Sequence, residues 1–94
     1  SGMKGKLGEA MAAGIPVVTT SIGAEGMGLT DGETAMIADT PEDFAAAVVR
    51  VSNDRDLWEK LASNAREYVR ANFSSETVAR TIDEAVSELT ARAE

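Results

Sequence analysis

The hydrophobic pattern at the start of the chain predicts one short helix followed by one buried strand. Small and apolar residues recur there at helical spacing, at Leu7, Ala10, Met11 and Gly14. Gly14 and the nearby Pro16 stop this pattern, so the helix is expected over residues 4–13. Residues 17–20 form an unbroken β-branched run, which is typical of a buried strand in a parallel sheet.

Glycines dominate the next segment and predict a loop over residues 21–32. They stand at Gly23, Gly26, Gly28 and Gly32. We interpret residues 23–28 as a permissive turn, because the glycine spacing is reversed relative to a dinucleotide-binding fingerprint and no helix is expected behind it. Asp31 and Gly32 form a second turn, and a short strand is expected over residues 35–38.

Three helices are predicted in the second half of the chain. Thr40, followed by a proline and two acids, begins the first helix; Asn53 or Asp54 caps the second; Ser74 caps the third. Their apolar stripes are expected to be buried, with the aromatic residues as core anchors. The stripes comprise Phe44, Ala47, Val48 and Val51; Leu57, Leu61, Ala65, Tyr68, Val69 and Phe73, with Trp58 beside them; and Val78, Ile82, Val86 and Leu89.

The predicted order is therefore helix, strand, strand, helix, helix, helix, an α/β arrangement with a small parallel sheet. Two strands are few for an independent parallel sheet, since such sheets are normally covered on both faces. We expect residues 1–94 to form a single partial domain, the C-terminal part of a larger one.

Composition and charge narrow the functional classes. The net charge of -7 opposes binding to nucleic acid and to anionic membranes. The absence of cysteine and histidine removes disulfides, thiolate chemistry and the commonest metal ligand, so no metal site is expected. There is no apolar run of about 18 residues and no signal-peptide pattern, which predicts a cytoplasmic segment without membrane insertion.

The entrance of the first helix is the main candidate for ligand chemistry. Residues 2–6 bring two glycines and two lysines to a helix N-terminus, where free N–H groups favour anions. It is not a P-loop, because Leu7 stands where a serine or threonine is needed. Two other interpretations of residues 2–6 remain. They are either an ordinary helix start that contains flexible glycines, or the Gly-x-x-Gly clamp of an RNA-binding KH module, which the net charge disfavours.

Glu9 is the second candidate for binding a ligand. At 100° per residue it lies about 200° from Leu7, opposite the apolar stripe. It is either a solvated surface glutamate or a carboxylate that faces a cleft and accepts hydrogen bonds from a ligand's hydroxyl groups. The periodicity does not decide between these two.

The longer pattern resembles a known family. The runs GEAMAAGIPVVTT at residues 8–20, DGETAMI at 31–37 and PEDF at 41–44 are similar to the donor-binding domain of GT-B-type retaining glycosyltransferases. This is the large family that includes sucrose synthase and bacterial mannosyltransferases. The resemblance covers nearly the whole chain and implies a Rossmann-like domain that binds a nucleotide sugar, a UDP- or GDP-sugar, without a further cofactor.

The resemblance also implies roles for individual residues. Glu9 matches the family glutamate that holds the ribose hydroxyls. Gly2, Met3, Lys4 and Gly5 fall where the family's loop approaches the sugar and diphosphate through backbone amides. Ser1 stands where many relatives carry a first glutamate that contacts the donor sugar. The resemblance assigns no catalytic residue within these 94 residues, and the acceptor and linkage are not defined by them.

We therefore expect a fragment of a retaining glycosyltransferase that is inactive alone. An uncovered strand edge and apolar face predict that it self-associates. The principal alternative is a non-catalytic helical protein-interaction module, in which the first residues are only a helix start.

Overall fold

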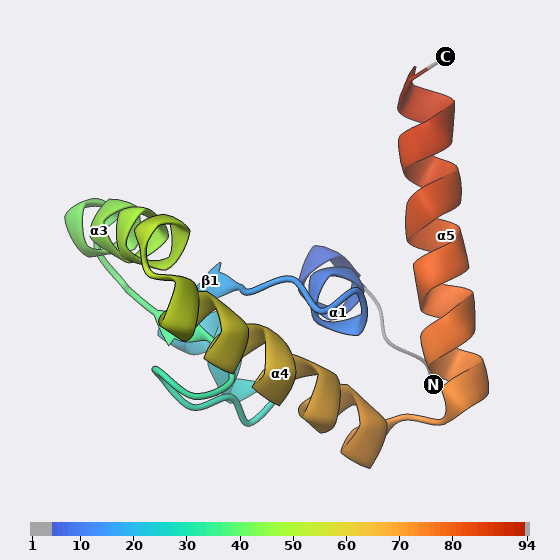
Figure 1. Ribbon diagram of the computed structural model, residues 1–94, viewed down its shortest axis with the longest axis horizontal. Helices are drawn as coiled ribbons and strands as arrows, with labels where there is room; N and C mark the ends of the chain where they lie inside the picture. Colours follow the sequence, from blue (N-terminus) through green and yellow to red (C-terminus); the bar gives the residue numbers. More distant parts are fainter. Residues whose placement is uncertain (1–4, 94) are drawn as a thin grey trace.

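The computed structural model describes residues 5–93, which form four longer helices around a small two-stranded sheet, with one short helix between the strands in chain order (Figure 1). In chain order the elements are α1 (Gly5–Ala12), β1 (Val18–Thr19), α2 (Ser21–Glu25), β2 (Met36–Ile37), α3 (Pro41–Asn53), α4 (Arg55–Asn72) and α5 (Ser75–Ala93). The molecule measures 34 × 34 × 25 Å. Its C-terminal helix projects beyond the rest, as Figure 1 shows.

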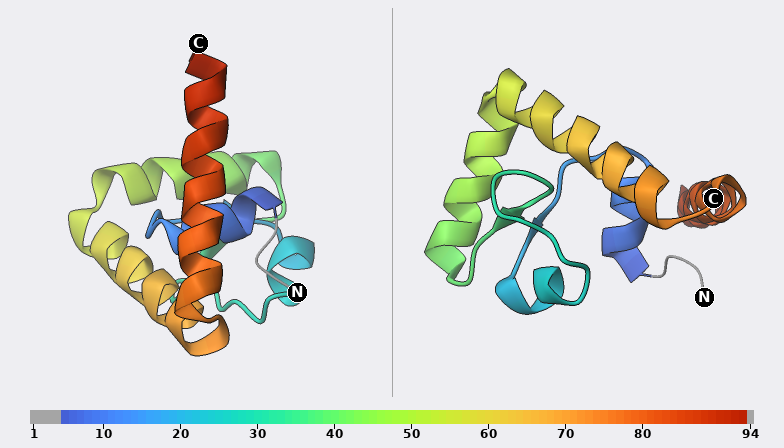
Figure 2. Two further views of the ribbon diagram at one scale, coloured as in Figure 1. Left: turned by 90° about the vertical axis from the view of Figure 1, so that its right-hand side faces the viewer. Right: turned by 90° about the horizontal axis from the view of Figure 1, so that it is seen from below.

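The two strands lie side by side and run parallel, with Val18 opposite Met36 and Thr19 opposite Ile37. This confirms the expected small parallel sheet, although each strand is only two residues long. Helix α3 packs on both strands, α4 packs on α3 and α1, and α5 lies across α1 (Figure 2). Helix α1 is therefore held between the long helices α4 and α5.

The glycine-rich segment contains helix α2, so the prediction of a continuous loop over residues 21–32 was wrong. Thr20 caps this helix by accepting a hydrogen bond from the Gly23 backbone N–H at 3.2 Å. Gly26 has an ordinary helical φ of -64°, and only Gly28 and Gly32 in this segment have positive φ. A threonine cap therefore outweighs the loop preference of the glycines, and a helix separates the two strands in chain order.

The predicted starts of the three long helices are confirmed. The side chains of Thr40 and Asp54 accept hydrogen bonds from the backbone N–H groups of Asp43 and Leu57, at 3.1 and 3.0 Å. Ser74 Oγ accepts one from Thr77 at 3.1 Å. Each of these bonds satisfies a donor that the first helical turn leaves without a partner.

The core consists of two clusters of buried side chains. The first lies between α1, α2 and α4 and is centred on Met11; the second lies between the sheet, α3 and α4 and contains Leu61. Tyr68 is half-buried, and its hydroxyl donates to the Met27 carbonyl at 2.6 Å. This bond fastens the loop after α2 to α4.

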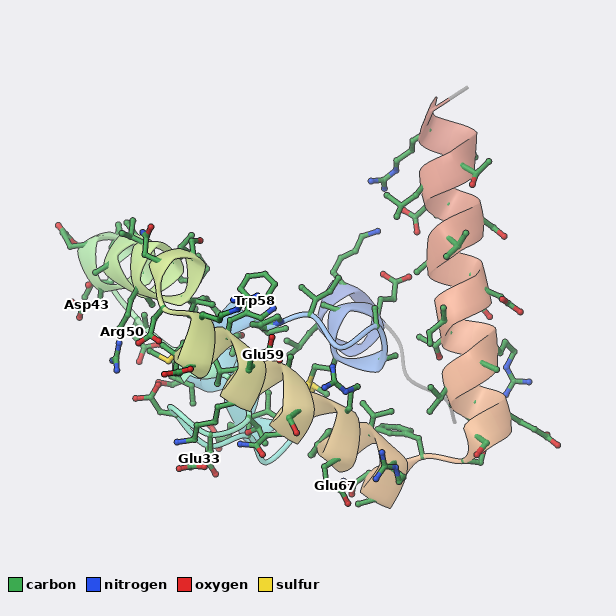
Figure 3. All side chains as sticks on the ribbon, viewed as in Figure 1. Glu33, Asp43, Arg50, Trp58, Glu59 and Glu67 are labelled. Carbon is green, nitrogen blue, oxygen red and sulfur yellow. The ribbon has the colours of Figure 1, made fainter. Side chains whose placement is uncertain are left out.

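Several predicted core residues are exposed instead. Their exposed fractions range from 38% to 65%, for Phe44, Val48, Trp58, Val86 and Leu89. Trp58, labelled in Figure 3, is therefore not a core anchor. In α3 the sheet covers only the side of the stripe that carries Ala47 and Val51. In α5 Thr81 is buried, whereas Val86 and Leu89, farther along the helix, are open to solvent.

Candidate functional site

Helix α1 is bracketed by two glycines with left-handed backbone conformations. Gly5, at its start, has φ of +83° and open space around the position of a Cβ atom. Gly14, after its end, has φ of +75°. The backbone N–H groups of Ile15 and Gly14 donate to the carbonyls of Ala10 and Met11 at 2.9 and 3.0 Å. This is the Schellman arrangement, which fixes where the helix ends.

Glu9 lies on the side of α1 that faces α5. Its side chain is 22% exposed and lines a groove of about 310 Å³ between the two helices. The apolar part of that groove is formed by Ala10, Ala13, Ile15, Ile82, Ala85, Val86 and Leu89. Within residues 5–93, no protein donor makes a hydrogen bond to the Glu9 carboxylate. The carboxylate is therefore neither in the hydrophobic core nor on an open helix face.

Charged groups from both helices form the rim of this groove. Lys6 Nζ lies 2.8 Å from Glu88 Oε1 and 3.8 Å from Glu9 Oε2. Arg92 Nη2 lies 2.5 Å from the same Glu88 oxygen. The hydrogen bond from Lys6, and then the positive charges of Lys6 and Arg92, hold the pKa of Glu88 below its ordinary value. Sequence reasoning missed Glu88 and Arg92, because no local pattern shows which face of α5 will meet α1.

The residues predicted from the sequence fall into two groups. Gly2, Met3 and Lys4 lie outside the described residues, so the predicted contact between their backbone and a diphosphate stays a prediction. Gly5 and Glu9 lie one turn apart on α1. The groove that Glu9 lines also receives Lys6, so an acid and a cation stand together near the entrance of the helix.

A second polar contact joins the carboxyl ends of the two strands. Asp39, two residues after β2, accepts hydrogen bonds from the backbone N–H of Ser21, at 2.8 Å, and from the Ser21 hydroxyl. Both bonds favour the ionised carboxyl, and they lower its pKa. The contact ties the start of α2 to the end of β2, at the edge of the sheet where open α/β folds bind ligands.

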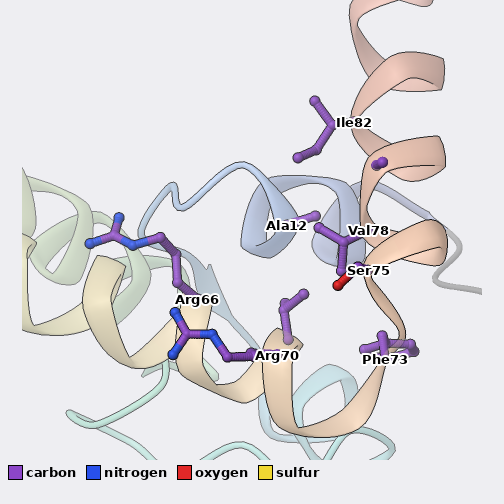
Figure 4. A pocket seen from close by; sticks show the side chains of 9 residues that line it. Ala12, Arg66, Arg70, Phe73, Ser75, Val78 and Ile82 are labelled. Atoms are coloured by element: carbon purple, nitrogen blue, oxygen red, sulfur yellow. The ribbon is translucent and has the colours of Figure 1, made fainter.

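A larger, mainly apolar hollow of about 400 Å³ lies between α4, α5 and the end of α1 (Figure 4). Phe73, Val78 and Ile82 supply much of its lining, and Arg66 and Arg70 stand on its α4 side. The Arg66 side chain packs against the backbone at Gly14.

Within residues 5–93, no group of three or more acidic side chains is placed to hold a metal ion, and no helix has the length and apolarity to cross a membrane.

Comparison with known families identifies the class of protein. Residues 1–54, more than half of the chain, match the family described as glycosyl transferases group 1. The chain therefore belongs to the glycosyl transferases group 1 family, which confirms the resemblance read from the sequence.

Individual relatives agree with this membership. The chain is 36% identical over 78 residues to the "Putative glycosyltransferase YtcC" of Bacillus subtilis (strain 168), covering 80% of this chain and 19% of that protein. It is 34% identical over 77 residues to a D-inositol 3-phosphate glycosyltransferase of Nocardioides sp. (strain ATCC BAA-499 / JS614), covering 80% and 17%. The chain thus spans about a fifth of the length of the curated relatives it matches. No solved structure matches it significantly.

Proposed function

We propose that this chain supplies part of the nucleotide-sugar site of a GT-B-type glycosyltransferase. In the proposal, Glu9 accepts hydrogen bonds from the ribose hydroxyls of a UDP- or GDP-sugar. The backbone at Gly2, Met3, Lys4 and Gly5 approaches the diphosphate and the sugar. One observation carries the assignment: a half-buried carboxylate without a hydrogen-bond donor from the described residues lines a groove one turn inside the entrance of α1. Family membership supports it.

The chemistry follows from the charge that develops as the sugar leaves its diphosphate. Free N–H groups at a helix N-terminus and a nearby cation such as Lys6 stabilise that negative charge. The longer enzyme would transfer the sugar to an acceptor with retention of configuration. In this proposal the present residues bind and orient the donor, while the acceptor and the group that assists bond cleavage are supplied by other parts of that enzyme.

Calorimetric titration of UDP and GDP into Glu9→Gln and wild type tests the ribose role. Hydrogen bonds to a charged group are worth about 1.5–3 kcal/mol each, so the variant should bind the preferred nucleotide at least about tenfold more weakly. Glu59→Gln is the matched control, because that acid lies on α4, outside the groove. Equal nucleotide affinity in wild type and Glu9→Gln would refute the ribose contact.

The exposed apolar residues of α3 and α5 favour one alternative, a non-catalytic helical interaction module. Hydrogen exchange separates the two functions. A donor site requires nucleotide-dependent protection of amides in α1, whereas an interaction module shows no protection by UDP or GDP at any concentration that saturates related enzymes.

We further propose that the chain self-associates through the face beside β1. Here a hollow of about 260 Å³ is lined by residues that include Pro16, Val18, Phe44, Val48 and Trp58. Among residues 5–93, strand β1 pairs with β2 and has no strand on its other edge. An unpaired strand edge next to exposed apolar side chains is a template for pairing with another chain.

A further inference from the structure

The cation nearest to the Glu9 groove already has a partner from another part of the chain. Lys6 Nζ hydrogen-bonds to Glu88 at 2.8 Å, across 82 positions of sequence, and lies farther, at 3.8 Å, from Glu9 of its own helix. The Lys6 side chain is nevertheless 71% exposed. A phosphate can therefore reach the ammonium group without any rearrangement of the core.

We propose that Glu88 of α5 competes with the diphosphate of the donor for Lys6, so that α5 partly inhibits the site it borders. This inference rests on the proposed donor site. A lysine ammonium is a single charge on a flexible stem, and it exchanges one anionic partner for another easily. A diphosphate brings more negative charge than the one carboxylate it displaces, which favours the exchange.

Arg92 gives Glu88 a second ionic partner, so the carboxylate is still paired after Lys6 leaves. Its guanidinium lies one helical turn away, 2.5 Å from the same carboxylate oxygen. When Lys6 turns toward a phosphate, Glu88 keeps this cation as its partner and is not left alone. Helices α1 and α5 also pack against each other, so the competition changes an ion pair and leaves this packing in place.

Inorganic pyrophosphate is the probe, titrated into the 94-residue chain by calorimetry. Exposed ion pairs are worth up to about 1 kcal/mol, so removing the competitor in Glu88→Gln should raise pyrophosphate affinity about two- to fivefold. Glu84→Gln is the control. It removes the same charge one turn earlier on α5, and no ion pair joins Glu84 to another residue within 5–93.

A double-mutant cycle with Lys6→Gln separates competition from a general change in charge. If Glu88 acts through Lys6, then Glu88→Gln has no effect on pyrophosphate affinity once Lys6 is absent. The proposal is overturned if Glu84→Gln raises the affinity equally, if the gain persists without Lys6, or if the chain binds no pyrophosphate. Failure of the ribose contact shows separately, as UDP affinity that Glu9→Gln leaves unchanged while the pyrophosphate cycle still behaves as expected.

Discussion

Replacing Gly14, the residue that ends helix α1, is predicted to lower the stability of the fold for a definable reason. Its φ of +75° places it in the left-handed region, where an L-residue costs about 1–2 kcal/mol. A Cβ atom would also lie 2.8 Å from Arg66 Nη1, but this is the far end of a flexible side chain that can move aside. Gly14→Ala should therefore lower the free energy of unfolding by about 1–2 kcal/mol, mainly through backbone strain.

Urea denaturation followed by circular dichroism and Trp58 fluorescence measures this loss. With a slope of about 2 kcal/mol per molar urea, typical of small domains, the midpoint should fall by about 0.5–1 M. Gly14→Asn should lose less, because asparagine tolerates the left-handed conformation. Gly26→Ala is the matched control, since Gly26 has φ of -64° and open space around it. Equal losses for the alanine variants at positions 14 and 26 would refute the reasoning.

Three further predictions concern the capping of α3, acid stability and assembly. Thr40→Ala should cost about 0.5–2 kcal/mol by removing the cap of α3, and Thr40→Ser should restore most of it in thermal melts. The hydrogen bonds from Ser21 lower the pKa of Asp39 in the folded state. The ionised Asp39 carboxylate therefore contributes its full stabilisation above the ordinary pKa of aspartate, and this stabilisation is lost as the pH falls through the pKa of Asp39 in the folded state. The stability advantage of wild type over Asp39→Asn should therefore vanish in acid; an advantage independent of pH would contradict this. In sedimentation velocity the chain should form larger species as its concentration rises, and Trp58→Gln should weaken this; a monomer at every concentration excludes self-association.

The parts of the fold that were predictable from sequence depend on local interactions. The caps at Thr40, Asp54 and Ser74 act within one helical turn, so the residues that form them are neighbours in the sequence. The stop after α1 is equally local, since Gly14 supplies the left-handed residue that the Schellman bonds require. The structure places Glu9 in the groove between α1 and α5, whereas the ribose contact that the family motif implies for it stays a prediction.

Most of the wrong predictions depend on contacts between distant segments. Helix α2 has a local cap at Thr20, which the glycine pattern obscured, but it is also bonded to Asp39, and no pattern within residues 21–28 reveals that partner. Periodicity located the apolar stripe of α3 but not how much of it the sheet would cover, so Phe44 was wrongly placed in the core. The same reasoning could not show that Glu88 would meet Lys6, since that depends on the direction in which α5 leaves α4.

The direction in which α5 leaves α4 depends on the short connection between the two helices. Only Phe73 and Ser74 separate α4 from α5, and Phe73 has an extended backbone with φ of -138° and ψ of 150°. The 19 residues of α5 form a rod of about 28 Å. A tilt of about 10° at this joint would therefore carry the free tip roughly 5 Å sideways, while the first turn of the rod would scarcely shift. A small change in the backbone angles of Phe73 therefore displaces the far end of α5 much more than its first turn. Glu88 and Arg92, which lie near that end, move the most.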